Sequence, residues 1–440
     1  ELEQFEAKLT ALGLMERFGN FVRGGHWRGF LAKYAEANLM HKKMLAVSDR
    51  YHELSARPQL DLGDLARIRD LLYAGQCNCP YWHGVFGGLY LPHLRQAVYR
   101  CLVEAEAIVQ RLSGRTSEVV CEDRDRDGHP EIVFSGRYLG MVVSPHDGGR
   151  ILELDCRETG HNLTDCLSRR HEGYHHKLLD RHGESNGESA KSIHDLVLVK
   201  EPGLERLLVE DPYLRRPLTD HFIPAETSLE DFSAVRYAEL GDFVDQPFDH
   251  SLREREDGYE LVLNRTGRVG RDGHTVPVAL TKTILFPKLG NIISVEYRVV
   301  PAGPTDISAM FGVEFDFNLL APEADDRYAV IDGVVPDKAY LAASAETPAV
   351  RRVVYLDRYQ QVGIAIEADR PARLWRMPIY TVSLSEAGFE KVFQGNCTLF
   401  LFQPAFAAGE EFAVRFALYA GPLSKLPENH PAGRVAANHT

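Results

Sequence analysis

The sequence predicts an α+β protein in which an N-terminal helical-bundle domain precedes a large antiparallel β-sandwich. Two observations lead to this fold class. Up to about residue 112, apolar side chains recur at the spacing of amphipathic helices, and beyond that point they occur in short runs typical of strands. Turn-forming residues separate these later runs and little helical pattern lies between them, which favours a sandwich over a layered α/β fold.

The clearest predicted helix closes the first domain. Its apolar positions recur every three or four residues, at Leu94, Val98, Cys101, Ala105, Ile108 and Leu112. A shorter stripe of the same kind contains Leu62, Leu65, Ile68 and Leu72. Gly114 and the small polar residues around it mark a boundary, so we expect the helical domain to span 1–112.

The second domain is expected to span 116–421, and its strands are predicted from apolar and β-branched runs bounded by turns. These runs are 131–134, 259–263, 275–286, 292–300, 311–319, 362–367, 398–402 and 412–418. Trp375 falls in a strand-like stretch and is expected in the core. Residues 422–440 are rich in Pro, Asn and His and are expected to form a flexible tail.

Composition limits the classes of function. The net charge of −13 argues against a nucleic-acid partner, which would require a basic surface, whereas a neutral polysaccharide is compatible with it. No apolar run approaches the length of a membrane span, so we expect no membrane partner. Seven scattered cysteines, an odd number in a long chain, indicate reduced thiols and a cytoplasmic location.

The stretch 76–94 is unusually rich in aromatic residues, histidines and glycines. Glycine lets a ligand approach the backbone, and aromatic rings with a polar edge match the two-faced character of a sugar ring. This pattern predicts a sugar-binding platform made of Trp82, Tyr81, His83 and Asn78. The alternative is an aromatic loop buried under the following helix.

Several segments resemble glycoside hydrolase family 57, which contains 4-alpha-glucanotransferases and related alpha-amylases. Residues 76–94 resemble the family's QCN-x-x-YWHG-x-FGG-x-YLPHLR segment, and 21–30 its FVRGG-x-W segment. Further similar segments occur in the family's order at 33–45, 220–223 (DHFI), 239–247 (ELGDFVDQP) and 383–388 (SLSEAG).

The resemblance covers only the C-terminal part of that family. It implies a galactose-mutarotase-like β-sandwich and a retaining enzyme that acts on alpha-1,4-glucans by double displacement. The family's catalytic Glu and Asp lie on an N-terminal (β/α) barrel that nothing here resembles. We therefore expect a non-catalytic portion, inactive alone, whose partners are that barrel, a malto-oligosaccharide or alpha-1,4-glucan, and a second copy in a homodimer. A stand-alone carbohydrate-binding protein is the alternative.

The resemblance also assigns site residues. It places Trp82 at the glucan subsites, with Trp27, Asn38 and His41 approaching the same cleft; helix packing is the alternative for these three. Where the archaeal pattern has Asp, this chain has Cys79, so the choice between hydrolysis and transfer stays open.

A short acidic segment predicts a calcium site. Carboxylates alternate at Asp123, Asp125 and Asp127, and Glu131 follows after a glycine that permits a sharp turn. Calcium takes six to eight oxygen ligands, so these side chains and the His129 carbonyl form a suitable set. The alternative is a plain acidic surface turn.

A third class of function follows from His171-Glu172-Gly173-Tyr174-His175, which matches the H-E-x-x-H motif of zinc peptidases. On a helix, the two histidines would bind zinc and Glu172 would act as general base. His194, Asp195 and Glu201 are the candidates for a third ligand. The similar family segment lacks the first histidine, which favours a chance match.

Overall fold

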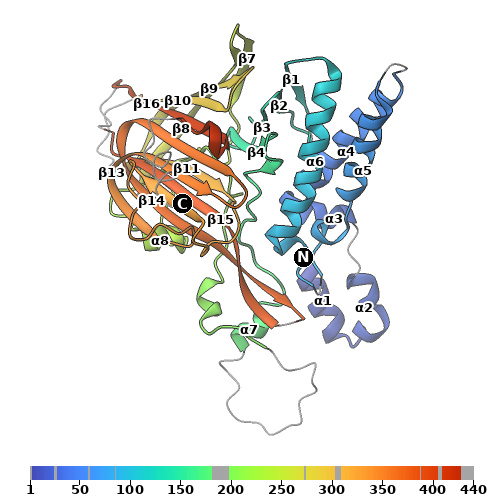
Figure 1. Ribbon diagram of the computed structural model, residues 1–440. Helices are drawn as coiled ribbons and strands as arrows, with labels where there is room; N and C mark the ends of the chain where they lie inside the picture. Colours follow the sequence, from blue (N-terminus) through green and yellow to red (C-terminus); the bar gives the residue numbers. More distant parts are fainter. Residues whose placement is uncertain are drawn as a thin grey trace.

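The computed structural model describes residues 2–23, 27–57, 60–84, 86–180, 198–271, 274–302, 309–386, 388–404 and 409–427. It confirms the predicted fold class, with helices followed by antiparallel sheets (Figure 1). A small sheet formed by strands within 117–162 lies between the helices and the large sheet (Figure 1). Within the described ranges, no helix has the length and apolar character needed to cross a bilayer.

Among its described residues, the N-terminal part contains the α-helices α1 (Leu2–Ala11), α2 (Met15–Arg23), α3 (Trp27–Lys33), α4 (Ala35–Ser55), α5 (Leu62–Ala74) and α6 (Pro92–Ser113). Asp61 caps α5 by accepting a hydrogen bond from the Gly63 amide at 2.6 Å. Pro92 starts α6 and Gly114, with φ of +73°, ends it. The apolar faces of α4, α5 and α6 meet in one cluster that includes Met40, Ile68 and Leu102.

The first sheet contains β1 (Ser117–Glu122), β2 (Glu131–Gly136), β3 (Leu139–Ser144), β4 (Arg150–Cys156) and β5 (His161–Asn162), in that order. Every strand is antiparallel to its neighbour. One face of β2–β4 contributes Phe134, Met141 and Leu154 to the largest core cluster, which also contains side chains of the second sheet.

The second sheet has eleven strands: β6 (Thr219–Pro224), β7 (Asp249–Glu254), β8 (Gly258–Arg271), β9 (His274–Pro287), β10 (Ile292–Pro301), β11 (Ala309–Phe317), β12 (Arg327–Ile331), β13 (Ala345–Asp357), β14 (Val362–Ser385), β15 (Gly388–Phe402) and β16 (Phe412–Pro422). The strand order is β6-β11-β15-β14-β16-β10-β9-β8-β7, and β12 and β13 extend from β14.

This sheet folds over itself through the long strand β14. The first part of β14, from Val362 to Ala368, pairs with β16, whereas the part from Arg373 pairs with β15. Phe416 of β16 lies 5.3 Å from Phe315 of β11, ring centre to ring centre, although the two strands are not ladder neighbours. The two rings therefore meet edge to face between two layers of strands, which is the packing of a β-sandwich.

A buried lysine joins the helical part to the first sheet. Lys43 of α4 is 1% exposed and donates hydrogen bonds to Glu106 of α6 at 2.7 Å and to Glu153 and Asp155 of β4 at 2.6 and 2.7 Å. Burial disfavours the lysine's charge, but the three carboxylates outweigh this and raise its pKa. These buried ion pairs thus hold the helical domain against the first sheet.

Two predictions at the C-terminal end have different outcomes. Trp375 of β14 is buried as expected, and its indole N–H donates to Glu346 at 2.8 Å. The chain is still packed beyond the expected boundary at residue 421, because Leu423 and Leu426 contact the cluster around Tyr419. The rest of the expected tail, 428–440, lies outside the described residues.

Candidate functional site

The aromatic loop between α5 and α6 has two short 3₁₀ turns, Cys79–Tyr81 and Gly88–Tyr90. Tyr81 is only 5% exposed, belongs to the helical core and donates a hydrogen bond to the Gly75 carbonyl at 2.6 Å. The expectation that Tyr81 stands at an open face is therefore wrong. The 3₁₀ turn that begins at Cys79 directs this ring inward, and the following residue leaves the turn in an extended conformation.

Trp82, the next residue, is 43% exposed. Its indole lies on Gly84, where an added Cβ would be 2.7 Å from the ring. Gly88 has φ of +48°, and a Cβ there would be 2.1 Å from the Trp82 carbonyl oxygen. The Leu89 amide donates to that oxygen at 2.9 Å. The two glycines thus let the loop fold tightly beneath an indole that remains open to solvent.

The other residues predicted at the platform differ in their surroundings. Asn78 is exposed, whereas His83 is half-buried, with its ring 4.7 Å from that of Tyr90 and 5.5 Å from that of Tyr174. Burial lowers the pKa of His83. Phe86, which was not singled out from the sequence, is 73% exposed in the same loop. The position of Phe86 between glycines of this loop was the sequence feature that could have indicated an exposed aromatic side chain.

Trp27 and His41 lie together on the helical part. Trp27 is 43% exposed and meets the His41 ring edge-on at 5.9 Å, and His41 meets Tyr81 in the same way at 6.2 Å. Burial, then the charges of Lys42 and Arg126, lower the pKa of His41, which favours a neutral imidazole. Asn38 is engaged elsewhere, since its side-chain N–H donates to the Asp125 carbonyl at 2.7 Å.

Glu172 supports this region from the β domain. Its buried carboxylate accepts hydrogen bonds from Lys33 at 2.8 Å, Tyr34 at 2.7 Å and Tyr90 at 2.6 Å. Burial would raise the pKa of Glu172, but these three donors outweigh it and lower the pKa. Glu172 therefore connects α3 to the start of α6, a role that the sequence did not reveal.

The zinc-peptidase interpretation of the same segment is wrong. Residues 171 and 172 are irregular, 173–175 form a turn, and α7 (His176–Asp180) begins only after them. The ring nitrogens of His175 contact the Glu172 amide at 3.2 Å and the Val382 carbonyl at 2.9 Å, while Glu172 is held by the three donors above. Glu201 pairs with Lys391, and His194 and Asp195 lie outside the described residues.

The acidic loop between β1 and β2 brings three carboxylates together. Oxygens of Asp123, Asp125 and Asp127 lie within 4.8 Å of one another. The Asp127 amide donates to Asp123 at 3.0 Å and to Asp125 at 3.1 Å, which curls the loop. Burial and the neighbouring charge of Asp127 raise the pKa of Asp125 to about 6.

The two remaining predicted calcium ligands flank this group. Glu131 accepts a hydrogen bond from the Arg124 amide at 2.8 Å, and burial followed by repulsion from Asp125 raises its pKa to about 8. The His129 amide donates to Asp127 at 2.7 Å, and its ring stacks on His146 at 3.3 Å. Negative charge is therefore concentrated at the loop, and a cation would relieve the repulsion.

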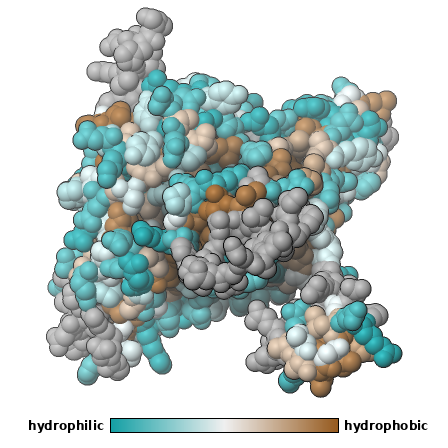
Figure 2. Space-filling view, turned by 90° about the horizontal axis from the view of Figure 1, so that it is seen from below, coloured by the Kyte–Doolittle hydropathy of each residue, from teal (hydrophilic) through white to brown (hydrophobic). Residues whose placement is uncertain are grey.

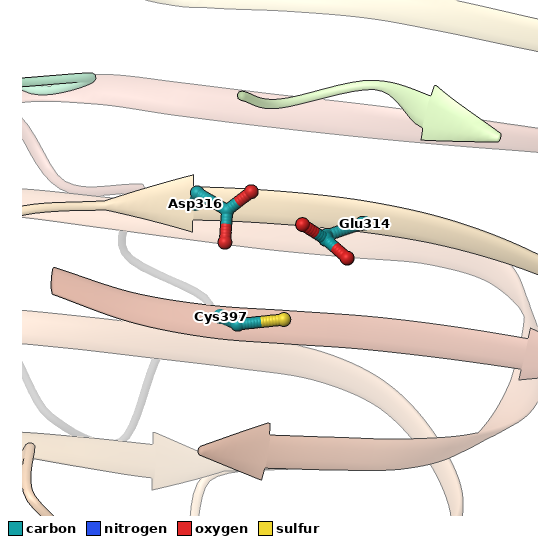
Figure 3. A group of neighbouring side chains, drawn as sticks. All are labelled: Glu314, Asp316 and Cys397. Carbon is teal, nitrogen blue, oxygen red and sulfur yellow. The ribbon is translucent and has the colours of Figure 1, made fainter. Parts of the chain in front are cut away.

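A second acidic group is deeply buried in the sandwich. Figure 3 shows Glu314 and Asp316 on β11 next to Cys397 on β15. Arg215 donates to Glu314 at 3.0 Å, and this guanidinium outweighs burial to lower the pKa of Glu314. Burial and the neighbouring Glu314 charge raise the pKa of Asp316, which favours its protonated form. Arg215 and His221 thus compensate the charge of Glu314 inside the sandwich.

Two family models cover most of this chain. Residues 123–416 match alpha-amylase/4-alpha-glucanotransferase, C-terminal, and residues 25–109 match the middle domain of the same family. The chain therefore belongs to the alpha-amylase/4-alpha-glucanotransferase family, in agreement with the glycoside hydrolase family 57 segments recognised in its sequence.

The relatives include enzymes of both names. The chain is 34% identical over 421 residues to alpha-amylase 1 of Dictyoglomus thermophilum, covering 94% of this chain and 57% of that protein. It is 33% identical over 414 residues to the 4-alpha-glucanotransferase of Thermococcus kodakarensis, covering 94% and 55%. The crystal structure of 4-alpha-glucanotransferase from Thermococcus litoralis aligns with a TM-score of 0.69 and 31% identity, covering 95% and 55%. The chain thus spans about half the length of these relatives.

Proposed function

We propose that this chain forms one wall of the substrate cleft of an enzyme acting on alpha-1,4-glucans, with Trp82 as the sugar-stacking platform. The single observation that carries the proposal is the open indole of Trp82, seated on Gly84 within a segment shared with the family. An indole face offers apolar area to the C–H face of a glucose unit. Asn78 and His83 are the polar neighbours that would orient its hydroxyls.

The reaction that we propose for the whole enzyme is retaining double displacement at an alpha-1,4 bond. Water as acceptor gives hydrolysis, and a second glucan gives transfer. The two carboxyl groups required would come from a (β/α) barrel, and this chain would orient the glucan. One relative is named an alpha-amylase and another a 4-alpha-glucanotransferase, and both names support an alpha-glucan substrate. They do not decide whether water or a second glucan is the acceptor.

Exposed apolar side chains offer a docking surface for such a barrel. Phe5 of α1, Leu12 in the turn after it and Phe18 of α2 are exposed. Trp27 and Phe86 are exposed as well. Figure 2 shows hydrophobic patches between hydrophilic areas on the lower face of the molecule. Apolar patches on a protein surface commonly mark interfaces, which favours a protein partner at these helices. The free cysteines favour a cytoplasmic location for the assembly.

We further propose that calcium binds the loop of Asp123, Asp125 and Asp127. The convergent carboxylate oxygens and the backbone turn that gathers them support a hard cation, which prefers oxygen ligands. Glu131 and the His129 carbonyl would complete the set. The metal would act structurally, because its loop also anchors Asn38 of α4 through the Asp125 carbonyl.

The platform is tested by titrating the 440-residue chain with maltoheptaose in a calorimeter and, in parallel, following the oligosaccharide products. We expect binding without turnover, and we expect Trp82→Ala to weaken binding by about tenfold, equivalent to ~1.4 kcal/mol. Tyr73→Ala is the matched control, since Tyr73 is an exposed aromatic residue of α5 outside the loop. Equal binding by all three proteins contradicts the platform, and new products contradict a non-catalytic role.

A further inference from the structure

The aromatic loop that carries Trp82 is held by the β domain as well as by its own helices. Its second 3₁₀ turn, Gly88–Tyr90, is buried. The Leu89 amide of this turn donates a hydrogen bond to the Trp82 carbonyl at 2.9 Å. The side chains that fix the turn therefore also fix the backbone from which the open indole projects.

Gln394 of β15 reaches this turn from the β domain. Its Nε2 group donates a hydrogen bond to the Tyr90 carbonyl at 3.0 Å, and its Oε1 atom accepts one from Arg95 at 3.0 Å. Arg95 in turn donates from Nη1 to the Leu89 carbonyl at 2.6 Å. One carbonyl group of the turn is thus bound to Gln394 itself, and the other to an arginine that Gln394 helps to orient.

Glu172 holds the same turn through a side chain. Its Oε1 atom accepts a hydrogen bond from the Tyr90 hydroxyl at 2.6 Å. The Tyr90 ring lies 4.7 Å from the His83 ring, centre to centre, and His83 also meets Tyr174 of the β domain at 5.5 Å. The indole of Trp82 and its polar neighbour His83 therefore both rest on a turn that the β domain anchors.

These anchors are shielded from water. Arg95, Glu172 and Gln394 are buried, which strengthens their hydrogen bonds to the turn. Burial opposes the charge of Glu172, but its hydrogen-bond donors outweigh burial and lower its pKa. The bond from Tyr90 is therefore charge-assisted and stronger than a neutral one. The indole of Trp82 is open to solvent, so its orientation depends on the backbone of the loop.

We propose that Glu172 and Gln394 are positioning residues of the glucan platform. They hold the Gly88–Tyr90 turn and, through it, keep Trp82 and His83 in the arrangement that accepts a glucose unit. The proposal rests on the platform role proposed for Trp82. It adds that the β domain determines how well the helical domain holds a sugar, although the proposed platform residues all lie in the helical domain.

The test compares two tyrosines that donate to the same atom. Tyr34 and Tyr90 are both buried, and their hydroxyl groups donate to Oε1 of Glu172 at 2.7 and 2.6 Å. Tyr90→Phe frees the turn from Glu172, whereas Tyr34→Phe makes the same chemical change outside the aromatic loop. We expect similar losses of stability in urea unfolding. Tyr90→Phe should weaken maltoheptaose binding about threefold in the calorimeter, and Tyr34→Phe should leave it unchanged.

Two further measurements extend the comparison. Gln394→Met removes the other anchor and keeps a side chain of similar size; combined with Tyr90→Phe, it should weaken maltoheptaose binding about tenfold. The fluorescence anisotropy of Trp82 needs no sugar and is measured in a Trp27→Phe background, where the remaining tryptophan, Trp375, is buried. The anisotropy should fall in Tyr90→Phe and fall further in the double variant, because the indole moves more freely.

The outcomes separate the anchors from the platform. The positioning role is refuted if Tyr90→Phe leaves the affinity for maltoheptaose unchanged while Trp82→Ala lowers it; the platform then stands without its anchors. Equal losses of affinity in Tyr34→Phe and Tyr90→Phe also refute it, because the effect is then a general loss of stability. If Trp82→Ala binds maltoheptaose as the parent chain does, while Tyr90→Phe still lowers the anisotropy, the platform fails and the anchors hold an indole that binds no sugar.

Discussion

Replacing Lys43 with methionine should release the helical part from the sheet. The change removes three ion pairs of 2.6 to 2.7 Å and leaves Glu106, Glu153 and Asp155 buried without their shared cation. Removing one partner of a buried pair costs about 3–5 kcal/mol, because the remaining charge is neither hydrated nor paired. We therefore expect Lys43→Met to lower the free energy of unfolding by this amount at pH 7. A typical domain has a free energy of unfolding of about 5–15 kcal/mol, so the loss is a large fraction of the total.

The pH dependence separates this electrostatic cost from a packing defect. Without Lys43, the folded-state pKa of Glu106, which Lys43 now lowers, should rise, and that of Asp155, which burial already raises, should rise further. Groups with raised pKa values contribute fully at low pH, and the contribution is lost as pH rises through the folded pKa. The loss in free energy of unfolding of Lys43→Met, relative to the parent protein, should therefore be small near pH 4–5 and grow towards ~pH 7. A packing defect would instead lower the free energy of unfolding by the same amount at both pH values.

The assay is urea unfolding followed by circular dichroism at several pH values. Lys42→Met is the matched control, because Lys42 is the preceding residue of α4, is only half-buried, and should cost less than about 1 kcal/mol. An equal loss in both variants, or a loss in Lys43→Met that does not change with pH, would refute the reasoning.

Three further predictions concern single sites. Tyr81→Ala should lower the free energy of unfolding by about 3–5 kcal/mol, because it opens a cavity in the helical core. Trp82→Ala should lower it by only roughly 1–2 kcal/mol, because solvent fills the space left by the exposed ring. Unfolding curves in which Trp82→Ala is the less stable variant would contradict this assignment of a buried Tyr81 and an open Trp82. Millimolar calcium should raise the melting temperature of chelator-treated protein, and Asp125→Asn should abolish the rise; an unchanged melt argues against the site. Asp316→Asn should be tolerated within about 1 kcal/mol, whereas Glu314→Gln should cost about 3–5 kcal/mol because it removes the buried carboxylate that Arg215 and His221 share; equal losses would contradict a protonated Asp316.

Local patterns in the sequence predicted some of the elements, whereas strands such as β3, β4 and β13 were not predicted. The stripe from Leu94 to Leu112 predicted the helix observed at Pro92–Ser113, and the run 275–286 falls within β9. The course of β14 could not be predicted, because Val362–Ser385 pairs with β16 in one half and with β15 in the other. Such a change of partner depends on contacts between distant segments, which alternation along one strand does not encode.

The site was predictable as a segment but not residue by residue. Tyr81 and Trp82 are adjacent aromatic residues, and only the 3₁₀ turn decides that one is buried and the other open. Glu172 was interpreted through a metal motif, whereas its function depends on Lys33 and Tyr34, more than a hundred residues away in the chain. Sequence spacing identifies chemical groups, and their partners come from the tertiary fold.

The central claim is that the Trp82 indole stacks on glucan. Tryptophan fluorescence tests it directly, because the chain has only three tryptophans and Trp375 is buried. Maltoheptaose should shift the emission of the parent chain and of Trp27→Phe to shorter wavelength by shielding Trp82 from water, and the shift should vanish in Trp82→Phe. A shift that survives in Trp82→Phe, or that disappears in Trp27→Phe, would contradict the account.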